Sequence, residues 1–192
     1  MIDEAVAAIR AGEPVVLPTD TVYGLCAAAE SESAAGEVAR LKGRAAQQPI
    51  ALLARDVDRL RECVPELDER VLRALLPGPY TLILPNPARR YPWLGGNDTI
   101  GIRVPDLPAP SSAVLDEVGA VLATSANLHG GSDPRRLEDV PEEICRAAGA
   151  LVDAGELPGT PSTVLDLTGP EPKVLREGAV PAAEALGLLT GG

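Results

Sequence analysis

Aromatic residues are almost absent from this chain of 192 residues. It contains no Phe, one Trp and three Tyr. Platforms that stack the bases of single-stranded nucleic acid need several exposed rings, and four aromatic residues are too few to build them. The hydrophobic core must therefore consist mainly of Ala, Val, Leu and Ile.

Histidine and cysteine are also scarce, which argues against several kinds of catalytic and metal site. His129 is the only histidine, and a Ser-His-Asp triad would need Ser125 only four residues away, with no nucleophile-elbow pattern. Cys26, Cys63 and Cys145 are too far apart for a disulfide framework or a zinc cluster. The chain also lacks the GxxxxGK[ST] and GxGxxG motifs of P-loop nucleotidases and Rossmann dehydrogenases.

Long apolar runs and excess positive charge are missing too. No segment approaches the ~20 apolar residues that span a membrane, and the acidic start of the chain lacks a signal-peptide pattern. We therefore expect a cytoplasmic protein without a membrane partner. The formal net charge of −11 opposes broad binding to a phosphate backbone, but 17 basic residues still permit a local cationic crevice for a small anion.

Helical and strand-like segments alternate along the chain, which predicts an α/β fold. Helices are expected at 3–10, with Asp3 as the cap, and at 33–41, 56–63, 68–76, 111–118, 141–148 and 181–189. Strands are expected at 15–17, 50–54, 80–84, 99–104, 120–124, 150–152, 163–167 and 174–175. Without a repeat or a long linker, residues 1–192 are expected to form one domain, in which 85–98 is a candidate binding loop.

The octapeptide PTDTVYGL at 18–25 is the most informative stretch. It follows the apolar run 15–17 and is interpreted as a buried strand that enters a polar turn at Gly24. Strand ends that face a crevice hold ligands in open α/β sheets. A plain loop, with Asp20 making a local turn bond, explains the same residues equally well.

Four basic residues are candidates for anion binding. Lys42 and Arg44 flank Gly43, where a helix break could turn both toward one target, although the helix macrodipole alone also favours basic residues there. Arg103 lies in an apolar strand, where it must snorkel, pair with a carboxylate or bind a ligand anion; it could equally face solvent. Arg176 poses the same question, with Glu177 as an ordinary charged neighbour.

Hydroxyl and amide groups follow or open two other strands. Ser125 and Asn127 close the strand at 120–124, and Ser162 and Thr163 open the strand at 163–167. These groups could reach a ligand's phosphate or ribose, but Ser and Asn are also ordinary turn and cap residues.

Taken in order, these pieces resemble the YrdC/YciO family of threonylcarbamoyl-AMP synthases. The segments that carry the resemblance are PTDTVYGL at 18–25, KGR at 42–44, PGPYTLIL at 77–84, TIGIRVP at 99–105, TSAN at 124–127, PSTVLDL at 161–167 and LREG at 175–178. The resemblance implies a YrdC-like fold, in which helices flank a twisted mixed sheet with a deep concave cavity. It also implies that L-threonine, bicarbonate or CO2, and ATP are converted to threonylcarbamoyl-AMP and pyrophosphate. A separate transferase complex would then modify adenosine 37 of tRNA.

The resemblance assigns two sets of contacts. The first would bind ATP, accompanied by Mg²⁺, and consists of Lys42, Arg44, Thr99, Ser125, Asn127 and Arg176, with Lys42 and Arg44 as the catalytic pair. The second would bind L-threonine and consists of Thr21, Tyr23, Arg103, Ala123 and Ser162, with Arg103 on the carboxylate. No protein side chain is assigned as a metal ligand, and Asp20 receives no role beyond ordering its loop.

The chain departs from the commonest family pattern in two places. Leu128-His129-Gly130 follows TSAN where many members have Ser-Gly, and 45–48 and 50–53 lack the usual proline and histidine, respectively. The extra C-terminal domain of longer members is expected to be missing. Two alternatives stay open: a module that binds double-stranded RNA or tRNA directly, and a YciO-type relative with a different substrate.

Overall fold

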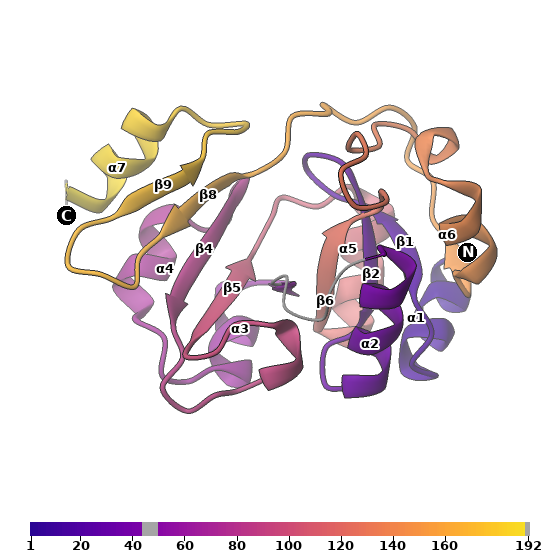
Figure 1. Cartoon of the computed structure of the whole chain (residues 1–192), viewed down its shortest axis with the longest axis horizontal. Helices are drawn as coiled ribbons and strands as arrows, with labels where there is room; N and C mark the ends of the chain where they lie inside the picture. The colour runs from indigo at the N-terminus through magenta and orange to yellow at the C-terminus, as the bar shows by residue number, and fades with distance from the viewer. Residues whose placement is uncertain (44–49, 191–192) are drawn as a thin grey trace.

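One mixed sheet organises the chain, and the computed structural model describes it for residues 1–43 and 50–190 (Figure 1). Its strands are β1 (Val15–Pro18), β2 (Tyr23–Ala28), β3 (Ala51–Ala54), β4 (Tyr80–Pro85), β5 (Thr99–Arg103), β6 (Ala120–Ser125), β7 (Ala150–Leu151), β8 (Thr163–Asp166) and β9 (Lys173–Arg176). Among the described residues they are ordered β7-β1-β2-β6-β3-β5-β4-β8-β9. Three of the described strand pairs are parallel, namely β1–β7, β3–β5 and β4–β8, and the others are antiparallel. The predicted α/β fold with a mixed sheet is confirmed.

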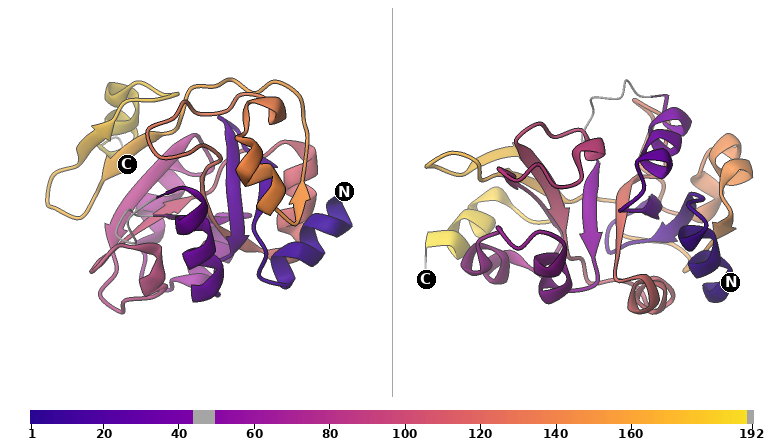
Figure 2. Two further views of the ribbon diagram at one scale, coloured as in Figure 1. Left: turned by 45° about the vertical axis from the view of Figure 1, so that its right-hand side comes forward. Right: turned by 90° about the horizontal axis from the view of Figure 1, so that it is seen from below.

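Helices cover both faces of this sheet. They are α1 (Ile2–Arg10), α2 (Glu32–Leu41), α3 (Val57–Cys63), α4 (Glu69–Leu75), α5 (Ala109–Val118), α6 (Glu142–Ala147) and α7 (Ala182–Thr190), with 3-10 turns η1 (Pro92–Leu94) and η2 (Leu137–Asp139). α1 and α5 pack on each other and share one apolar cluster with β1 and β6. Figure 2 shows α2 on the opposite face, where a larger cluster also joins α3 and α4 to the sheet.

Side-chain caps explain where three helices begin. The Ser31 hydroxyl accepts a bond from the backbone of Ala34 ahead of α2, and Asp56 and Asp68 do the same for α3 and α4. Asp3 does not cap α1 as expected. It lies inside the first turn, because α1 already begins at Ile2 with Met1 at the cap position. There its negative charge still opposes the positive end of the helix dipole.

The sequence interpretation missed β2. The sequence predicts a strand end followed by a turn over 18–25, but the turn occupies only Thr19–Val22 and the chain returns as an antiparallel strand from Tyr23. The polar turn residues obscured the apolar run Leu25-Cys26-Ala27-Ala28 that continues the hairpin. The octapeptide is therefore a hairpin that places its threonines at one end of two adjacent strands.

The described core contains few large rings, as the composition required. Its largest fully buried side chains are mostly Leu and Ile, and the exceptions are Tyr23 and Lys42. The expected binding loop at 85–98 contains η1, whose Trp93 donates a hydrogen bond to the Ala29 carbonyl at 2.8 Å. Among the described helices, none combines the length and hydropathy that a membrane crossing requires.

Candidate functional site

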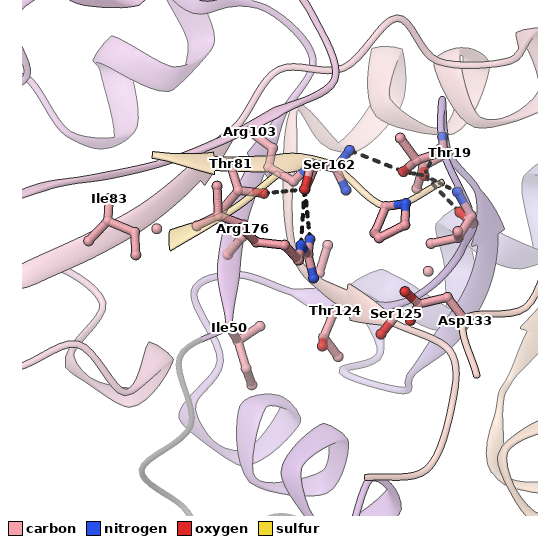
Figure 3. Close-up of a pocket in the computed structure, with 18 residues that line it drawn as sticks. Thr19, Ile50, Thr81, Ile83, Arg103, Thr124, Ser125, Asp133, Ser162 and Arg176 are labelled. Carbon is pink, nitrogen blue, oxygen red and sulfur yellow. Dashed lines mark hydrogen bonds between the residues drawn. The ribbon is translucent and has the colours of Figure 1, made fainter. Parts of the chain in front are cut away.

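A cavity of about 240 Å³ lies over the middle of the sheet (Figure 3). Its walls come from the β1–β2 turn, from β3, β4, β5 and β6, and from the segment that leads through β8 to β9. Strand alternation determines which side chains reach it. Along β4 the core takes Tyr80, Leu82 and Leu84, while Thr81 and Ile83 face the cavity.

The first wall carries a buried ion pair. Arg103 Nη2 lies 2.7 Å from Asp20 Oδ1, and the side chains are only 12% and 9% exposed. The contact uses one nitrogen and one oxygen, so it is not the bidentate fork that Arg and a carboxylate can form. Asp20 Oδ2 and Arg103 Nε are buried and have no hydrogen-bond partner among the described residues. Each charge therefore retains unused hydrogen-bonding capacity.

Burial dominates the electrostatics of this pair. Desolvation raises the pKa of Asp20, although the Arg103 charge acts to lower it. Desolvation also lowers the pKa of Arg103, against the opposing effect of Asp20. The neighbouring Cys26 thiol is fully buried, and burial raises its pKa to about 12, so Cys26 adds no charge to this wall at neutral pH. The pair is a desolvated dipole held beside the cavity.

Threonine hydroxyls fix the turn that carries Asp20. Thr19 Oγ1 donates to the Val22 carbonyl at 2.7 Å and lies 3.2 Å from Thr21 Oγ1. Thr21 Oγ1 also lies 3.4 Å from Asp20 Oδ1 and 3.5 Å from Arg103 Nη2. Because Thr19 and Thr21 are both buried, the turn has little freedom to move the carboxylate.

The second wall holds Arg176 without a carboxylate. Its Nε and Nη2 donate to the Ser162 carbonyl at 3.1 and 2.9 Å, and Nη2 lies 3.2 Å from Ser162 Oγ. Ser162 Oγ is also 2.7 Å from Thr81 Oγ1. Figure 3 shows the Arg176 guanidinium reaching in among the labelled residues from this side. Arg176 forms no ion pair within the described chain, so this wall keeps its positive charge.

Lys42 stands just behind the cavity. Its Nζ donates to the Ser125 carbonyl and, at 2.7 Å, to Asn127 Oδ1, and the residue is only 1% exposed. Ser125 lines the cavity, whereas Lys42 and Asn127 do not appear on its surface. Asn127 is bound within its own loop, where it also donates to the Gly131 carbonyl at 2.6 Å. Lys42 therefore braces the loop after β6 in this structure.

Tyr23 is predicted to form a pocket wall, and the structure places its side chain away from the cavity surface. The side chain is fully buried and absent from the cavity surface. Its hydroxyl contacts Asp153 Oδ1 and the Gly155 carbonyl, both at 2.8 Å. Burial raises the pKa of this hydroxyl. Strand alternation gives the reason, because β2 presents Gly24 to the cavity and its neighbour Tyr23 to the other face.

Thr99 is also absent from the cavity. It opens β5 opposite Pro85, four residues before Arg103. At about 3.3 Å per residue it lies roughly 13 Å along the strand from that arginine. Of the other expected residues, Thr21, Arg103, Ala123, Ser125, Ser162 and Arg176 are brought together on the cavity surface. Arg44 lies outside the described residues.

Sequence reasoning missed two partners of these residues. Asp20 had no assigned role, yet it is the carboxylate that pairs with Arg103. Thr81 was not singled out, although the alternating pattern of 80–84 places it on the same face as Ile83. No group of three or more His, Cys, Asp or Glu suited to a metal ion is present among the described residues.

Comparison with known proteins decides the family. A family model for Sua5, YciO and YrdC, described as telomere recombination, matches residues 7–178. The chain belongs to the Sua5/YciO/YrdC family. The resemblance inferred from the seven motifs is thereby confirmed.

Relatives of this family member include a putative threonylcarbamoyl-AMP synthase of Mycobacterium tuberculosis. It is 34% identical over 97% of this chain and 89% of its own length. The threonylcarbamoyl-AMP synthase of Bacillus subtilis is 33% identical over 93% of this chain and 54% of its own length. The chain thus spans about half of the Bacillus protein and most of the mycobacterial one.

A solved structure agrees with the fold. The crystal structure of Pyrococcus abyssi Sua5 complexed with L-threonine superposes with a TM-score of 0.89 at 32% identity. The match covers 98% of this chain and 57% of that protein. The arrangement of the family fold is therefore retained over nearly the full length described here.

Proposed function

We propose that this chain is a threonylcarbamoyl-AMP synthase, which joins L-threonine, CO2 or bicarbonate, and ATP. The observation that carries the proposal is a cavity with an arginine on each of two walls, the largely buried Arg103 and the exposed Arg176, and hydroxyl groups between them. The synthases named above and the threonine-bound Sua5 structure support it.

Threonine would occupy the wall formed by Arg103. The guanidinium uses one nitrogen on Asp20, so donors remain for a substrate carboxylate. Thr21 and Ser162 supply hydroxyls for the polar end of the side chain, and Ala123 leaves room beside them. An Arg fork matches a carboxylate in a way that the point charge of Lys cannot.

ATP would approach the opposite wall. Arg176 would take a phosphate oxygen, since no carboxylate in the described chain neutralises it. Ser125 is on the cavity surface next to Gly24 of β2, and Lys42 is bonded directly to it. The cavity of about 240 Å³ is smaller than the roughly 300 Å³ at which drug-sized pockets begin. The nucleotide would therefore extend across its mouth.

Mg²⁺ would enter with the triphosphate as part of the substrate. The described side chains provide no three-ligand cluster, but Ser125 and Asp133 present oxygen atoms to the cavity, and oxygen is what Mg²⁺ prefers. When bound, the ion would neutralise part of the phosphate charge.

The reaction needs positioning more than proton transfer. The unprotonated amine of threonine forms a bond to CO2, and its proton is released, which leaves a carbamate. A carbamate oxygen then attacks the α-phosphorus of ATP, and the bond to the bridging oxygen breaks so that pyrophosphate leaves with its electron pair. Both reactants are anions, so arginines on two walls would bring them together and stabilise the charge of the transition state.

The direct test is an assay of purified protein with ATP, Mg²⁺, labelled bicarbonate and L-threonine. We expect threonine-dependent release of pyrophosphate and a threonylcarbamoyl-AMP product in the mass spectrum. Arg103→Ala should abolish it, while Arg146→Ala, which breaks an exposed pair with Glu142, should not. Pyrophosphate release that is indifferent to threonine would contradict the proposal.

Two partner predictions remain proposals. The product would pass to a transferase complex that modifies tRNA, and the cytoplasm, which holds ATP and tRNA, is the proposed location.

Direct binding of double-stranded RNA or tRNA is the weaker idea, because many described arginines, such as Arg136 and Arg90, are paired with glutamates. Salt-dependent RNA binding without nucleotide turnover would favour it. A thermal-shift panel of amino acids with ATP would distinguish a YciO-type substrate from threonine.

A further inference from the structure

The buried pair of Asp20 and Arg103 is an inefficient way to stabilise the folded state. Two charges that are 9% and 12% exposed lose most of their hydration, and this pair recovers only one nitrogen–oxygen contact. Asp20 Oδ2 and Arg103 Nε have no partner among the described residues. Apolar residues of similar volume would avoid both costs. The pair is therefore a candidate for a functional role.

The charges of Asp20, Arg103 and their neighbours determine the net charge of this wall of the cavity. Asp20 cancels Arg103, and Cys26, whose pKa is raised by burial, stays neutral beside them. Arg176 is held by Ser162, and its positive charge is close enough to contribute to lowering the pKa of Arg103. Asp133 is a further carboxylate on the cavity surface. The hydroxyl of Thr21 touches both members of the pair and carries no charge. The Arg103 wall is thus a neutral dipole, with its positive end on the cavity surface and its negative end directly behind.

A neutral dipole and a lone cation prefer different ligands. A lone guanidinium attracts every carboxylate, and it repels the ammonium group that an amino acid carries next to its carboxylate. A guanidinium backed by a carboxylate still forms the short-range hydrogen bonds to a ligand carboxylate. Its long-range attraction for a net negative ligand falls, and its repulsion of the nearby ammonium group is offset. Such a site favours a zwitterion over a simple carboxylate.

We propose that Asp20 determines the specificity of the amino-acid pocket, by making the Arg103 wall select a zwitterionic α-amino acid and reject carboxylates that lack the amine. The inference rests on the proposed function, because it takes Arg103 as the group that receives the threonine carboxylate. It concerns the capture of the free amino acid, before any bond forms. Asp20 acts through Arg103 and is not itself on the cavity surface.

Asp20→Asn separates charge from geometry. The amide oxygen of Asn can still accept the 2.7 Å bond from Arg103 Nη2, so the guanidinium keeps its place while its counter-charge is lost. The matched control is Asp58→Asn, which makes the same change in an exposed pair where Asp58 lies 2.5 Å from Arg73. The two ligands are L-threonine and 3-hydroxybutanoate, which differs by replacement of the amine with hydrogen. Calorimetry gives the dissociation constant of each ligand for each protein.

We expect the native protein to bind threonine more tightly than 3-hydroxybutanoate. Asp20→Asn should reduce this ratio of dissociation constants at least tenfold, a change that corresponds to about 1.4 kcal/mol. Asp58→Asn should leave the ratio unchanged. A merely structural role for Asp20 would weaken both ligands together and not move the ratio.

Each other outcome is decisive. If Asp20→Asn binds threonine and keeps the native ratio within twofold, the specificity role of Asp20 is wrong. If the variant fails to fold, the native protein still decides, since equal affinity for 3-hydroxybutanoate and threonine overturns the inference. Asp20→Glu preserves the negative charge. If the native protein binds threonine more tightly than 3-hydroxybutanoate, and Asp20→Glu retains the native ratio of dissociation constants, the inference stands. Native protein that binds no threonine, with or without ATP, overturns the proposed function itself.

Discussion

The two walls of the cavity hold the same cation in opposite ways. Arg103 has a carboxylate behind it, whereas Arg176 donates to the carbonyl and hydroxyl of Ser162. A carbonyl orients a guanidinium without cancelling its charge, while a carboxylate does both. The difference suits the two proposed substrates, because an amino acid carries both charges and a nucleotide carries only negative ones. One residue type thus serves two ligands through the partner placed behind it.

The strongest way to break this contrast is Arg103→Ala. The change removes the proposed carboxylate contact and leaves Asp20 buried without its counter-charge. Breaking a buried pair costs about 3–5 kcal/mol of stability, and we expect kcat/KM for threonine to fall by at least about 100-fold. The measurements are urea denaturation and steady-state kinetics with threonine varied at saturating ATP.

The control for Arg103→Ala is Arg146→Ala, which breaks an exposed pair with Glu142. Exposed pairs contribute up to about 1 kcal/mol, so its stability and kinetics should stay near the native values. If Arg103→Ala retained native kcat/KM for threonine, Arg103 would not be the carboxylate receptor.

Removing Arg176 should affect the other wall. Without a carboxylate to be stranded, Arg176→Ala should destabilise the fold less than Arg103→Ala does. We expect the KM for ATP to rise by about 10-fold or more, since a charge-assisted hydrogen bond contributes about 1.5–3 kcal/mol. The threonine dissociation constant, measured by calorimetry without ATP, should change little. An equal loss for both ligands would show that the two walls do not divide the substrates.

Lys42→Met tests the support behind Ser125. The variant keeps the length of the side chain but removes the ammonium bonds to the Ser125 carbonyl and Asn127. We expect a loss of about 1–3 kcal/mol in the free energy of unfolding, because two buried acceptors lose a charged donor. Lys173→Met, at an exposed position in β9, is the control. Stability equal to that of the native protein would remove the bracing role.

The smallest expected effect contrasts Asp20 with a surface carboxylate. Asp56 caps α3, and its bond from the Arg59 backbone holds its pKa below the model-peptide value of 3.8. A lowered folded pKa means that the stabilisation is present above pH 3.8 and is lost as pH falls through the folded pKa. Asp56→Ala should therefore cost about 1 kcal/mol at pH 7, and this difference should shrink in urea denaturation near pH 3.

Asp20 should behave with the opposite sign. Its folded pKa is raised by burial, so its ionisation weakens the folded state as pH rises through the interval above 3.8. If Asp56→Ala lowered the free energy of unfolding by the same amount at pH 3 as at pH 7, the assignment of Asp56 as the cap of α3 would be contradicted. The two carboxylates thus make the effect of burial measurable in one protein.

Much of this fold was predictable because its signals are local. Caps such as Ser31 and Asp68, apolar runs and glycine breaks determine most element positions from their own neighbours. β2 was missed because the polar residues of 19–22 suggested that the strand had ended. Only pairing with β1 and β6 shows that the chain turns back as a strand.

The site was less accessible from sequence because its contacts join distant residues. Arg103 was expected to need a carboxylate or a ligand, but nothing in the sequence indicates that Asp20 lies 2.7 Å away. Tyr23 was placed in the pocket by its position in a motif, and the pleat of β2 turned it to the other face. Thr81 could have been predicted from the sequence. It is adjacent to Leu82, a core residue, and neighbouring residues of a strand point to opposite faces.

The sheet order has a consequence for how the cavity comes into existence. One wall is built from residues 19–24 and the other from residues 161–176, so closing the cavity requires contacts across most of the chain. Contacts between residues so distant in sequence form slowly, because the intervening loop must lose its freedom first. The cavity is thus a product of the whole sheet rather than a property of any one segment. A ligand that bridges the two walls would stabilise the folded state of the whole chain, and its affinity would depend on the integrity of the entire sheet.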